Sequence, residues 1–285
     1  MPIQIVFITD EKYVMPTTVA ITSILENKKK STSYHFYILG NTLSSTSKSI
    51  INKLKTDDTE ITIIDSTKEL NFKSGANAHV SKTACLKFYL PEILENLDKV
   101  LYLDSDIIVQ KDLTDLYETN ICDYYLASCL DALATSVSYD NRYFNSGVML
   151  LNLEKMRKDN IPNKLIEYKL TKNNTFMDQD AFNNVCKTSI KILPSRYNFL
   201  IMLMNRNKKH IDVNFFDKDF DKNTKKNYKK CSIIHYAYKY KPWEYNLKDI
   251  TKIFLKYYNK SLYRKYKLNL RNMNKFEILL KILFG

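Results

Sequence analysis

The stretch KVLYLDSDIIV, from Lys99 to Val109, combines the pattern of a buried strand with two carboxylates. Its apolar residues are mostly β-branched or aromatic, which is typical of a strand buried on both faces. Asp104 and Asp106 interrupt this run and are separated by one residue. Because alternate residues of an extended chain point the same way, both carboxylates would face one side and Ser105 the other.

Short apolar strands alternate with helices on both sides of this stretch. We expect strands at residues 4–9, 34–40 and 60–65, with helices near residues 16–30 and 44–54 between them. Downstream, we expect a helix at 83–96, strands ending at Asp131 and His235, and a strand that leads from Tyr143 into a helix. This order predicts an α/β fold with a mostly parallel sheet covered by helices. The length of 285 residues fits one large domain, or one domain with an appendage.

The position of the two carboxylates predicts a metal site. Ligands of such sheets bind beyond the carboxyl ends of the strands, where Asp104 and Asp106 would project. Two carboxylates this close repel each other unless a cation lies between them or one is protonated. A hard divalent ion such as Mg²⁺ or Mn²⁺ removes the repulsion and can then hold a diphosphate. The alternative is an ordinary polar end of a strand.

Three further stretches place polar groups where strands or helices begin or end. Asn145 precedes an apolar strand, and Asp178 and Gln179 open a helix pattern. His235 closes a late strand and Lys241 follows it. The imidazole can supply a third metal ligand, and the ammonium can neutralise a diphosphate.

Together and in this order, these stretches resemble glycosyltransferase family 8, the bacterial lipooligosaccharide galactosyl- and glucosyltransferase type. The resemblance covers roughly residues 3–245 and rests on IVFITDEKY, KVLYLDSDIIV, YFNSGVMLLNL, DQDAFN and HYAYKYKPW. It implies a GT-A nucleotide-sugar-binding fold with a mixed, mostly parallel central sheet in residues 1–245. It also implies metal-dependent, retaining transfer of galactose or glucose from a UDP-sugar to a hydroxyl of a cell-surface glycan or lipid-linked acceptor.

The resemblance also implies roles for individual residues. Asp104, Asp106 and His235 match the ligands of Mn²⁺, with Mg²⁺ as an alternative. The matches to the donor-binding residues are Asp10, Lys12, Tyr13, Lys87, Asp104, Ser105, Asn145 and Lys241. The matches to the reacting centre are Gln179, Asp178 and Asp131. Both front-face attack by the acceptor hydroxyl and a double displacement through a covalent glycosyl-enzyme remain open.

The sequence departs from the family pattern at three positions. Tyr238 stands where glycine is common, Cys85 where arginine is common, and Lys12 where asparagine is common. Because of these departures, the alternative is that the chain is a catalytically impaired relative that still binds a UDP-sugar.

The positive charge lies at the C-terminal end of the chain. Residues 1–205 hold 23 basic and 24 acidic residues, whereas residues 206–285 hold 21 and 7. Within the latter, LKDITKIFLKYYNK (residues 247–260) and NKFEILLKILF (274–284) repeat apolar residues at helical spacing, with lysines between them. Basic amphipathic helices bind anionic lipid. We therefore expect residues 246–285 to be a helical tail that holds a cytoplasmic enzyme at the inner face of the cell membrane. The alternative is that these helices pack back on the core.

Composition argues against other classes. No stretch approaches the ~18 apolar residues of a membrane span, and the N-terminus lacks the features of a signal peptide. The five cysteines form no CxxC pair, which favours reduced thiols over a zinc site. A nucleotidyltransferase needs phosphate-cradling glycines, and the chain has only four glycines. The basic, tyrosine-rich tail could suit nucleic acid, but no RNA-binding motif accompanies it, so we expect no nucleic-acid partner.

Overall fold

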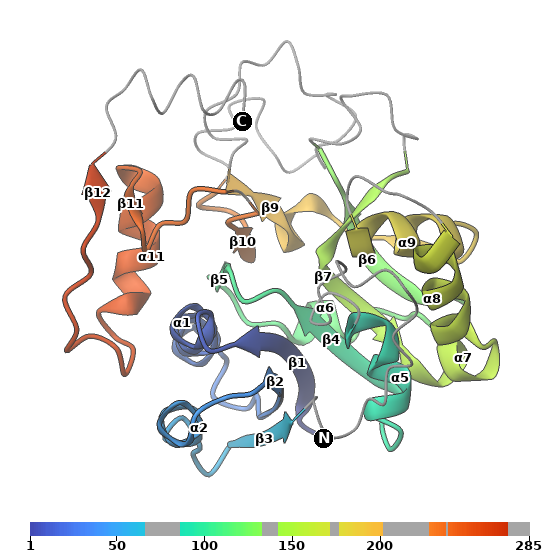
Figure 1. The fold of residues 1–285 in the computed structure, drawn as a ribbon, viewed down its shortest axis with the longest axis horizontal. Coiled ribbons are helices and arrows are strands. Elements are labelled where there is room, and N and C mark those ends of the chain that lie inside the picture. Colours follow the sequence, from blue (N-terminus) through green and yellow to red (C-terminus); the bar gives the residue numbers. More distant parts are fainter. Residues whose placement is uncertain (66–85, 133–141, 172–176, 202–227, 238, 273–285) are drawn as a thin grey trace.

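A computed structural model describes residues 1–65, 86–132, 142–171, 177–201, 228–237 and 239–272. Within these residues, seven strands form a central sheet (Figure 1). In spatial order they are β3 (Thr59–Asp65), β2 (Tyr34–Asn41), β1 (Ile3–Asp10), β4 (Lys99–Leu103), β7 (Phe144–Asn152), β6 (Leu126–Leu130) and β8 (Ile190–Ile192).

The sheet is mixed and mostly parallel, as predicted. Strands β1, β2, β3 and β4 run parallel, and β8 runs parallel to β6. Only β7 is reversed among these strands, because it pairs antiparallel with both β4 and β6. Its first residues therefore lie at the same edge of the sheet as the carboxyl ends of β4 and β6.

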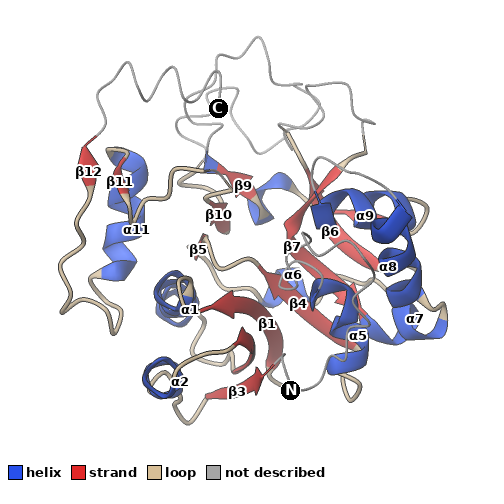
Figure 2. Cartoon of the chain, viewed as in Figure 1, coloured by secondary structure: helices blue, strands red, loops and turns tan. Residues whose placement is uncertain are grey.

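Helices cover both faces of the sheet (Figure 2). One face carries α1 (Val14–Asn27), α2 (Ser45–Asn52) and α6 (Thr114–Tyr117). The other carries α5 (Leu90–Ile93), α7 (Leu153–Lys158), α8 (Ile161–Thr171) and α9 (Met177–Val185). Successive side chains of β4 point to opposite faces of the sheet and contribute to both cores. Leu101 and Leu103 belong to the core that contains α1, whereas Val100 and Tyr102 belong to the core on the opposite face.

The predicted helix at residues 83–96 is shorter and less regular than expected. Its described part is a 3₁₀ turn, Leu86–Tyr89, followed by the single turn of α5, and residues 83–85 lie outside the described residues. Pro91 lies in the first turn of α5, where the missing proline N–H leaves no hydrogen bond unmade. A longer helix through this position would lose one such bond.

A small second sheet extends beyond the carboxyl end of β4. It contains β5 (Ile107–Val109), β10 (Ile233–His235) and β9 (Phe199–Leu200), with β10 in the middle. Strand β10 runs antiparallel to β5, and the pair aligns His235 with Ile107. This pairing brings a late part of the chain to the acid turn between β4 and β5.

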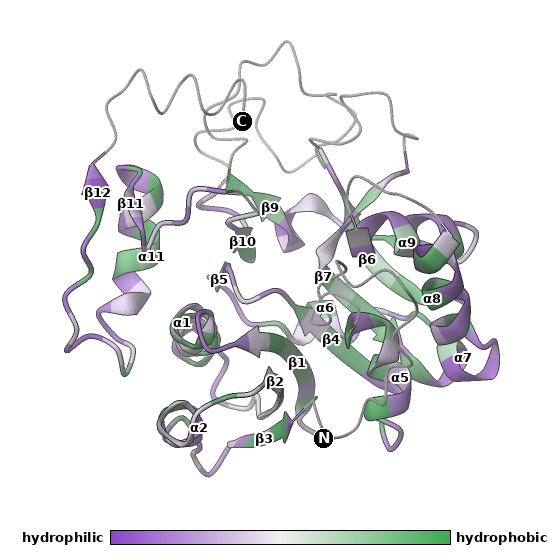
Figure 3. Ribbon diagram, viewed as in Figure 1, coloured by the Kyte–Doolittle hydropathy of each residue, from purple (hydrophilic) through white to green (hydrophobic). Residues whose placement is uncertain are grey.

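The first helix of the expected tail is part of the folded domain. Helix α11 (Asp249–Tyr258) buries Phe254 and Tyr257 in a core that also contains Val19 of α1 and Ile108 of β5. This helix carries both hydrophobic and hydrophilic residues (Figure 3), and Ile250 and Phe254 belong to the buried core. For this helix, packing back on the core is therefore the observed alternative, and its apolar face is not presented to lipid.

The structure describes the rest of the expected tail up to residue 272. Strand β12 (Arg271–Asn272) pairs with β11 (Tyr245–Asn246). This pairing joins the two ends of the segment 245–272. The second expected helix, at residues 274–284, lies outside the described residues. Among the residues that the structure describes, no helix has the length and hydrophobicity needed to cross a membrane.

Candidate active site

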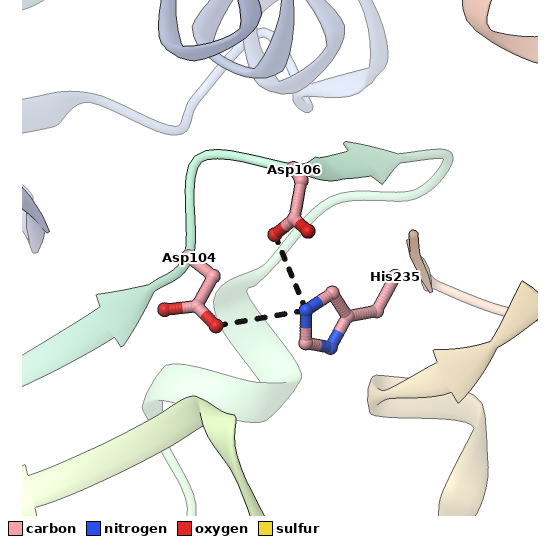
Figure 4. A group of neighbouring side chains, drawn as sticks. All are labelled: Asp104, Asp106 and His235. Atoms are coloured by element: carbon pink, nitrogen blue, oxygen red, sulfur yellow. Dashed lines mark ion pairs between the residues drawn. The ribbon is translucent and has the colours of Figure 1, made fainter. Parts of the chain in front are cut away.

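The two carboxylates occupy a turn between strands. Asp104 directly follows β4 and Asp106 directly precedes β5 (Figure 4). Between them, the Ser105 hydroxyl is buried, accepts a hydrogen bond from Thr17 Oγ1 at 2.8 Å and donates one to Ile8 O at 3.2 Å. The alternation predicted from the sequence is therefore present. The side chain of Ser105, which the family resemblance matches to the donor-binding residues, bonds to α1 and β1.

His235 completes a cluster with both carboxylates. Its Nε2 atom lies 3.3 Å from Oδ1 of Asp106 and 3.6 Å from Oδ2 of Asp104 (Figure 4). One ligand atom from each residue lies within 4.8 Å of the others. Two carboxylate oxygens and one imidazole nitrogen suit Mn²⁺, and the oxygens also suit Mg²⁺. The three residues predicted to bind metal are thus brought together.

Gly147 makes room for this cluster. A Cβ atom at this position would lie 2.2 Å from Cε1 of His235 and 2.7 Å from Oδ2 of Asp104. The backbone is anchored here as well, since Asp104 N donates to Gly147 O at 2.8 Å. Any larger residue would displace the imidazole or the carboxylate.

Two lysines neutralise the carboxylates. Lys241 Nζ lies 2.6 Å from Oδ2 of Asp106, and Lys87 Nζ lies 3.2 Å from Oδ1 of Asp104 and 2.7 Å from Oδ2 of Asp178. Burial alone raises the pKa of Asp106, but His235 and Lys241 outweigh it and hold that pKa well below its usual range.

Lys87 is buried between its two carboxylate partners. Burial lowers its pKa, but Asp104 and Asp178 more than compensate and raise that pKa well above the ordinary value. The ammonium also lies 4.7 Å from the centre of the Tyr102 ring. The side chain is therefore held as a charged group between Asp104 and Asp178.

The predicted sugar-facing residues form one hydrogen-bonded group. Oδ2 of Asp131 accepts from Nδ2 of Asn145 at 3.0 Å and from Nε2 of Gln179 at 3.1 Å. Oε1 of Gln179 accepts from Ser146 N at 3.1 Å, and Oδ2 of Asp178 accepts from Ser146 Oγ at 3.2 Å. The end of β6, the start of β7 and the first turn of α9 supply these groups.

The predicted nucleotide-binding residues lie where β1 leads into α1. Oδ1 of Asp10 accepts from Tyr13 N at 3.0 Å, which orders the turn, while Lys12 is exposed. The Tyr13 ring meets the edge of Trp243 with 5.8 Å between centres, and Trp243 in turn lies 5.4 Å from Phe254 of α11. Helix α11 thus supports a side of the candidate site.

Asn198 is a site residue that the sequence analysis missed. It lies between the 3₁₀ turn Ser195–Tyr197 and β9, is 3% exposed, and bonds to both His235 and Asn145. The only local signal is one polar residue before the apolar run FLIM, residues 199–202. Two departures from the family pattern, Cys85 and Tyr238, lie outside the described residues.

Comparisons with known proteins agree with this geometry. The model of glycosyl transferase family 8 matches residues 4–247. A putative glycosyltransferase of Haemophilus influenzae is 30% identical over 209 residues, covering 69% of this chain and 63% of that relative. The lipopolysaccharide 1,2-glucosyltransferase of Escherichia coli is 27% identical over 250 residues, covering 82% of this chain and 71% of that relative. The chain thus spans less than two thirds of the length of the first of these relatives.

The fold is shared with a solved enzyme structure. The galactosyltransferase LgtC, in complex with donor and acceptor sugar analogues, superposes with a TM-score of 0.69 at 25% identity, covering 91% of this chain and 96% of that chain. The predicted GT-A fold is therefore confirmed.

Proposed function

The chain belongs to glycosyltransferase family 8, and on that premise we propose a metal-dependent, retaining transfer of galactose or glucose from a UDP-sugar. The acceptor is a hydroxyl of a cell-surface glycan or a lipid-linked sugar. The observation that carries the proposal is the convergence of Asp104, Asp106 and His235 within 4.8 Å. Two relatives support the substrate class: the E. coli protein is named a lipopolysaccharide glucosyltransferase, and LgtC was solved with donor and acceptor sugar analogues.

Asp104, Asp106 and His235 would hold Mn²⁺, or Mg²⁺ in its place. When bound, such an ion supplies positive charge that stabilises a leaving diphosphate. Lys241 carries a second positive charge and is paired with Asp106 at 2.6 Å. We assign to its ammonium the donation of hydrogen bonds to the phosphate oxygens as the glycosidic bond breaks.

Asp178, Asp131 and Gln179 surround the proposed position of the sugar. Asp178 is paired with Lys87, and one oxygen of Asp131 accepts two hydrogen bonds. Carboxylates that are already engaged are weaker nucleophiles and still stabilise the positive charge that develops on the anomeric carbon. This arrangement favours front-face attack by the acceptor hydroxyl, whose proton passes to the leaving phosphate oxygen, over a double displacement through a covalent intermediate.

We further propose that the C-terminal region holds the enzyme on anionic membrane. Helix α11 buries its apolar face but leaves Lys252 and Lys256 exposed. The segment after it exposes Lys265, Tyr266 and Lys267, and Tyr266 is 63% exposed. Basic residues near an anionic surface each contribute about 1 kcal/mol of attraction. This surface supports a location at the inner face of the cell membrane, where lipid-linked acceptors are found.

Release of UDP from a panel of UDP-hexoses tests the proposed activity. With Mn²⁺ and no acceptor, we expect slow hydrolysis of UDP-galactose or UDP-glucose, lost on addition of EDTA and in Asp106→Asn. Binding of a UDP-sugar without any release of UDP, with or without lipid extract as acceptor, would favour the alternative of a catalytically impaired relative. Hydrolysis that is equal with EDTA would contradict the metal-dependent proposal.

A further inference from the structure

Asn198 connects the metal cluster to the sugar-facing group. Its Oδ1 lies 3.0 Å from Nδ1 of His235, and its Nδ2 donates to Oδ1 of Asn145 at 2.9 Å. All three side chains are more than nine-tenths buried. Among the described residues, Asn198 is the hydrogen-bond partner of Nδ1 of His235.

The orientation of each amide in this chain of bonds is determined by its neighbours. Gly147 N–H can only donate, and it donates to Oδ1 of Asn145 at 3.0 Å. The carboxylate of Asp131 accepts from Nδ2 of the same asparagine at 3.0 Å. The oxygen of Asn145 therefore faces Asn198, which must present its amide nitrogen there.

The same logic extends to the imidazole. Since the nitrogen of Asn198 faces Asn145, its oxygen faces His235, and Nδ1 of His235 must carry a proton to donate to it. In the neutral ring, the lone pair is then on Nε2, which is the nitrogen that faces Asp104 and Asp106. A metal-binding histidine needs this arrangement.

We propose that Asn198 is a positioning residue that sets the tautomer of His235 for metal binding and, through its other end, orients Asn145 at the sugar. The inference rests on the proposed metal-dependent function. One side chain thereby bonds to both halves of the site. The oxygen of Asn198 accepts from the metal ligand His235, and its nitrogen donates to Asn145 of the sugar-facing group.

Two substitutions separate these halves. Asn198→Ala removes both bonds, and outer-shell partners of this kind are worth about 10–100-fold in metal affinity. Asn198→Asp keeps an oxygen that accepts from Nδ1 of His235 but places an oxygen against Oδ1 of Asn145. We therefore expect Asn198→Ala to weaken Mn²⁺ binding, Asn198→Asp to restore it, and both to slow hydrolysis of the donor.

The experiment is a titration with Mn²⁺ alone, read by electron paramagnetic resonance of free Mn²⁺, followed by UDP release. Asn183→Ala is the matched control, because Asn183 is also a buried asparagine but bonds to the backbone of Phe144 and Gln179. We expect this control to bind Mn²⁺ like the wild type. Equal Mn²⁺ affinity in wild type and Asn198→Ala, or no recovery in Asn198→Asp, would overturn the inference while leaving the proposed function intact. A wild type that fails to bind Mn²⁺ would contradict the proposed function, and the inference with it.

Discussion

Gly147 leaves the space that the imidazole of His235 occupies, since a Cβ atom at residue 147 would lie 2.2 Å from Cε1 of that ring. We predict that Gly147→Ala lowers the affinity for Mn²⁺ by about 100-fold, the upper range for a disturbed ligand sphere. The physical reason is displacement of the imidazole from Asp104 and Asp106. Calorimetric titration with Mn²⁺ measures the effect.

Gly40→Ala is the control for this prediction. Its added methyl group would meet Cγ and Cδ1 of Leu43 at 2.5 Å, and the three nearest atoms all belong to that side chain and not to the metal cluster. We expect some loss of thermal stability and no change in Mn²⁺ affinity. If both glycine variants affect Mn²⁺ equally, the close approach at Gly147 has no special role in the site.

Removing the charge of Lys241 should slow loss of the diphosphate while leaving the metal ligands in place. Lys241→Met preserves most of the side-chain volume, and we expect a fall in kcat of about 10²–10³, typical of losing one group that stabilises developing charge. Lys239→Met is the control, because Lys239 is exposed two residues away. Steady-state hydrolysis of the donor measures both. Unchanged kcat in Lys241→Met would exclude the assigned role.

Lys87 links the metal cluster to the reacting centre through Asp104 and Asp178, with the shorter contact of 2.7 Å to Asp178. Lys87→Met leaves two carboxylates without their buried cation, and we expect a loss of about 3–5 kcal/mol in the free energy of unfolding. Adding Asp178→Asn should recover part of that loss, because one unpaired charge disappears. Urea denaturation of the single and double variants tests this. Strictly additive losses would show that the two residues do not interact.

Two truncations distinguish the membrane proposal from damage to the fold. Removal of residues 246–285 takes away α11 and its buried Phe254 and Tyr257, so we expect a poorly folded protein. Removal of residues 273–285 alone should leave donor hydrolysis intact and weaken binding to anionic vesicles. Phosphatidylcholine vesicles with and without phosphatidylglycerol, separated by flotation, measure this. Equal flotation of the short truncation and the full chain would contradict the role of residues 273–285 as an anchor and would assign any membrane binding to residues 1–272.

Protonation of Asp112 should contribute to the loss of folding stability at low pH. Burial raises the pKa of this carboxyl, but hydrogen bonds from Thr114, the Lys29 amide and Thr32 outweigh it and lower that pKa to about 2 from an ordinary 3.8. Because the folded pKa lies below the unfolded one, this stabilisation is present above the unfolded value and is lost as pH falls toward 2.

Asp112→Asn tests that linkage. We expect the variant to be less stable than the wild type at pH 7, with a difference that shrinks as pH falls from 4 to 2, as measured by thermal unfolding across that interval. A difference that stays constant with pH would show that the carboxylate charge makes no contribution.

Much of the fold followed from local pattern. The strand, acid turn and strand of residues 99–109 formed as predicted because burial and alternation are properties of neighbouring residues. The helix expected at 83–96 did not, because a new helical turn starts at Leu90 with Pro91 in its first turn. An apolar stripe such as that of α11 has the same spacing whether protein or lipid covers it, so its partner, the core beside Val19, is visible only in the structure.

The three residues of the candidate metal cluster could be named from the sequence, but the residue that supports His235 could not. Asp104, Asp106 and His235 are chemically distinctive residue types at the ends of strands. Asn198 reaches His235 only because β9 pairs with β10, which aligns Leu200 with His235, and no local pattern encodes that pairing. Residues that act through a distant partner depend on the tertiary fold.

The most direct test of the central claim is calorimetric titration of UDP-galactose and UDP-glucose, with GDP- and CDP-sugars as controls, into wild type and Asp106→Ala. Each is run with Mn²⁺ and with EDTA. We predict that one UDP-sugar binds to the wild type only with Mn²⁺, and that Asp106→Ala loses this binding. UDP-sugar binding that is equally tight with EDTA or in Asp106→Ala, or no binding of any nucleotide sugar, would contradict the account of Asp104, Asp106 and His235 as a metal site that holds the donor.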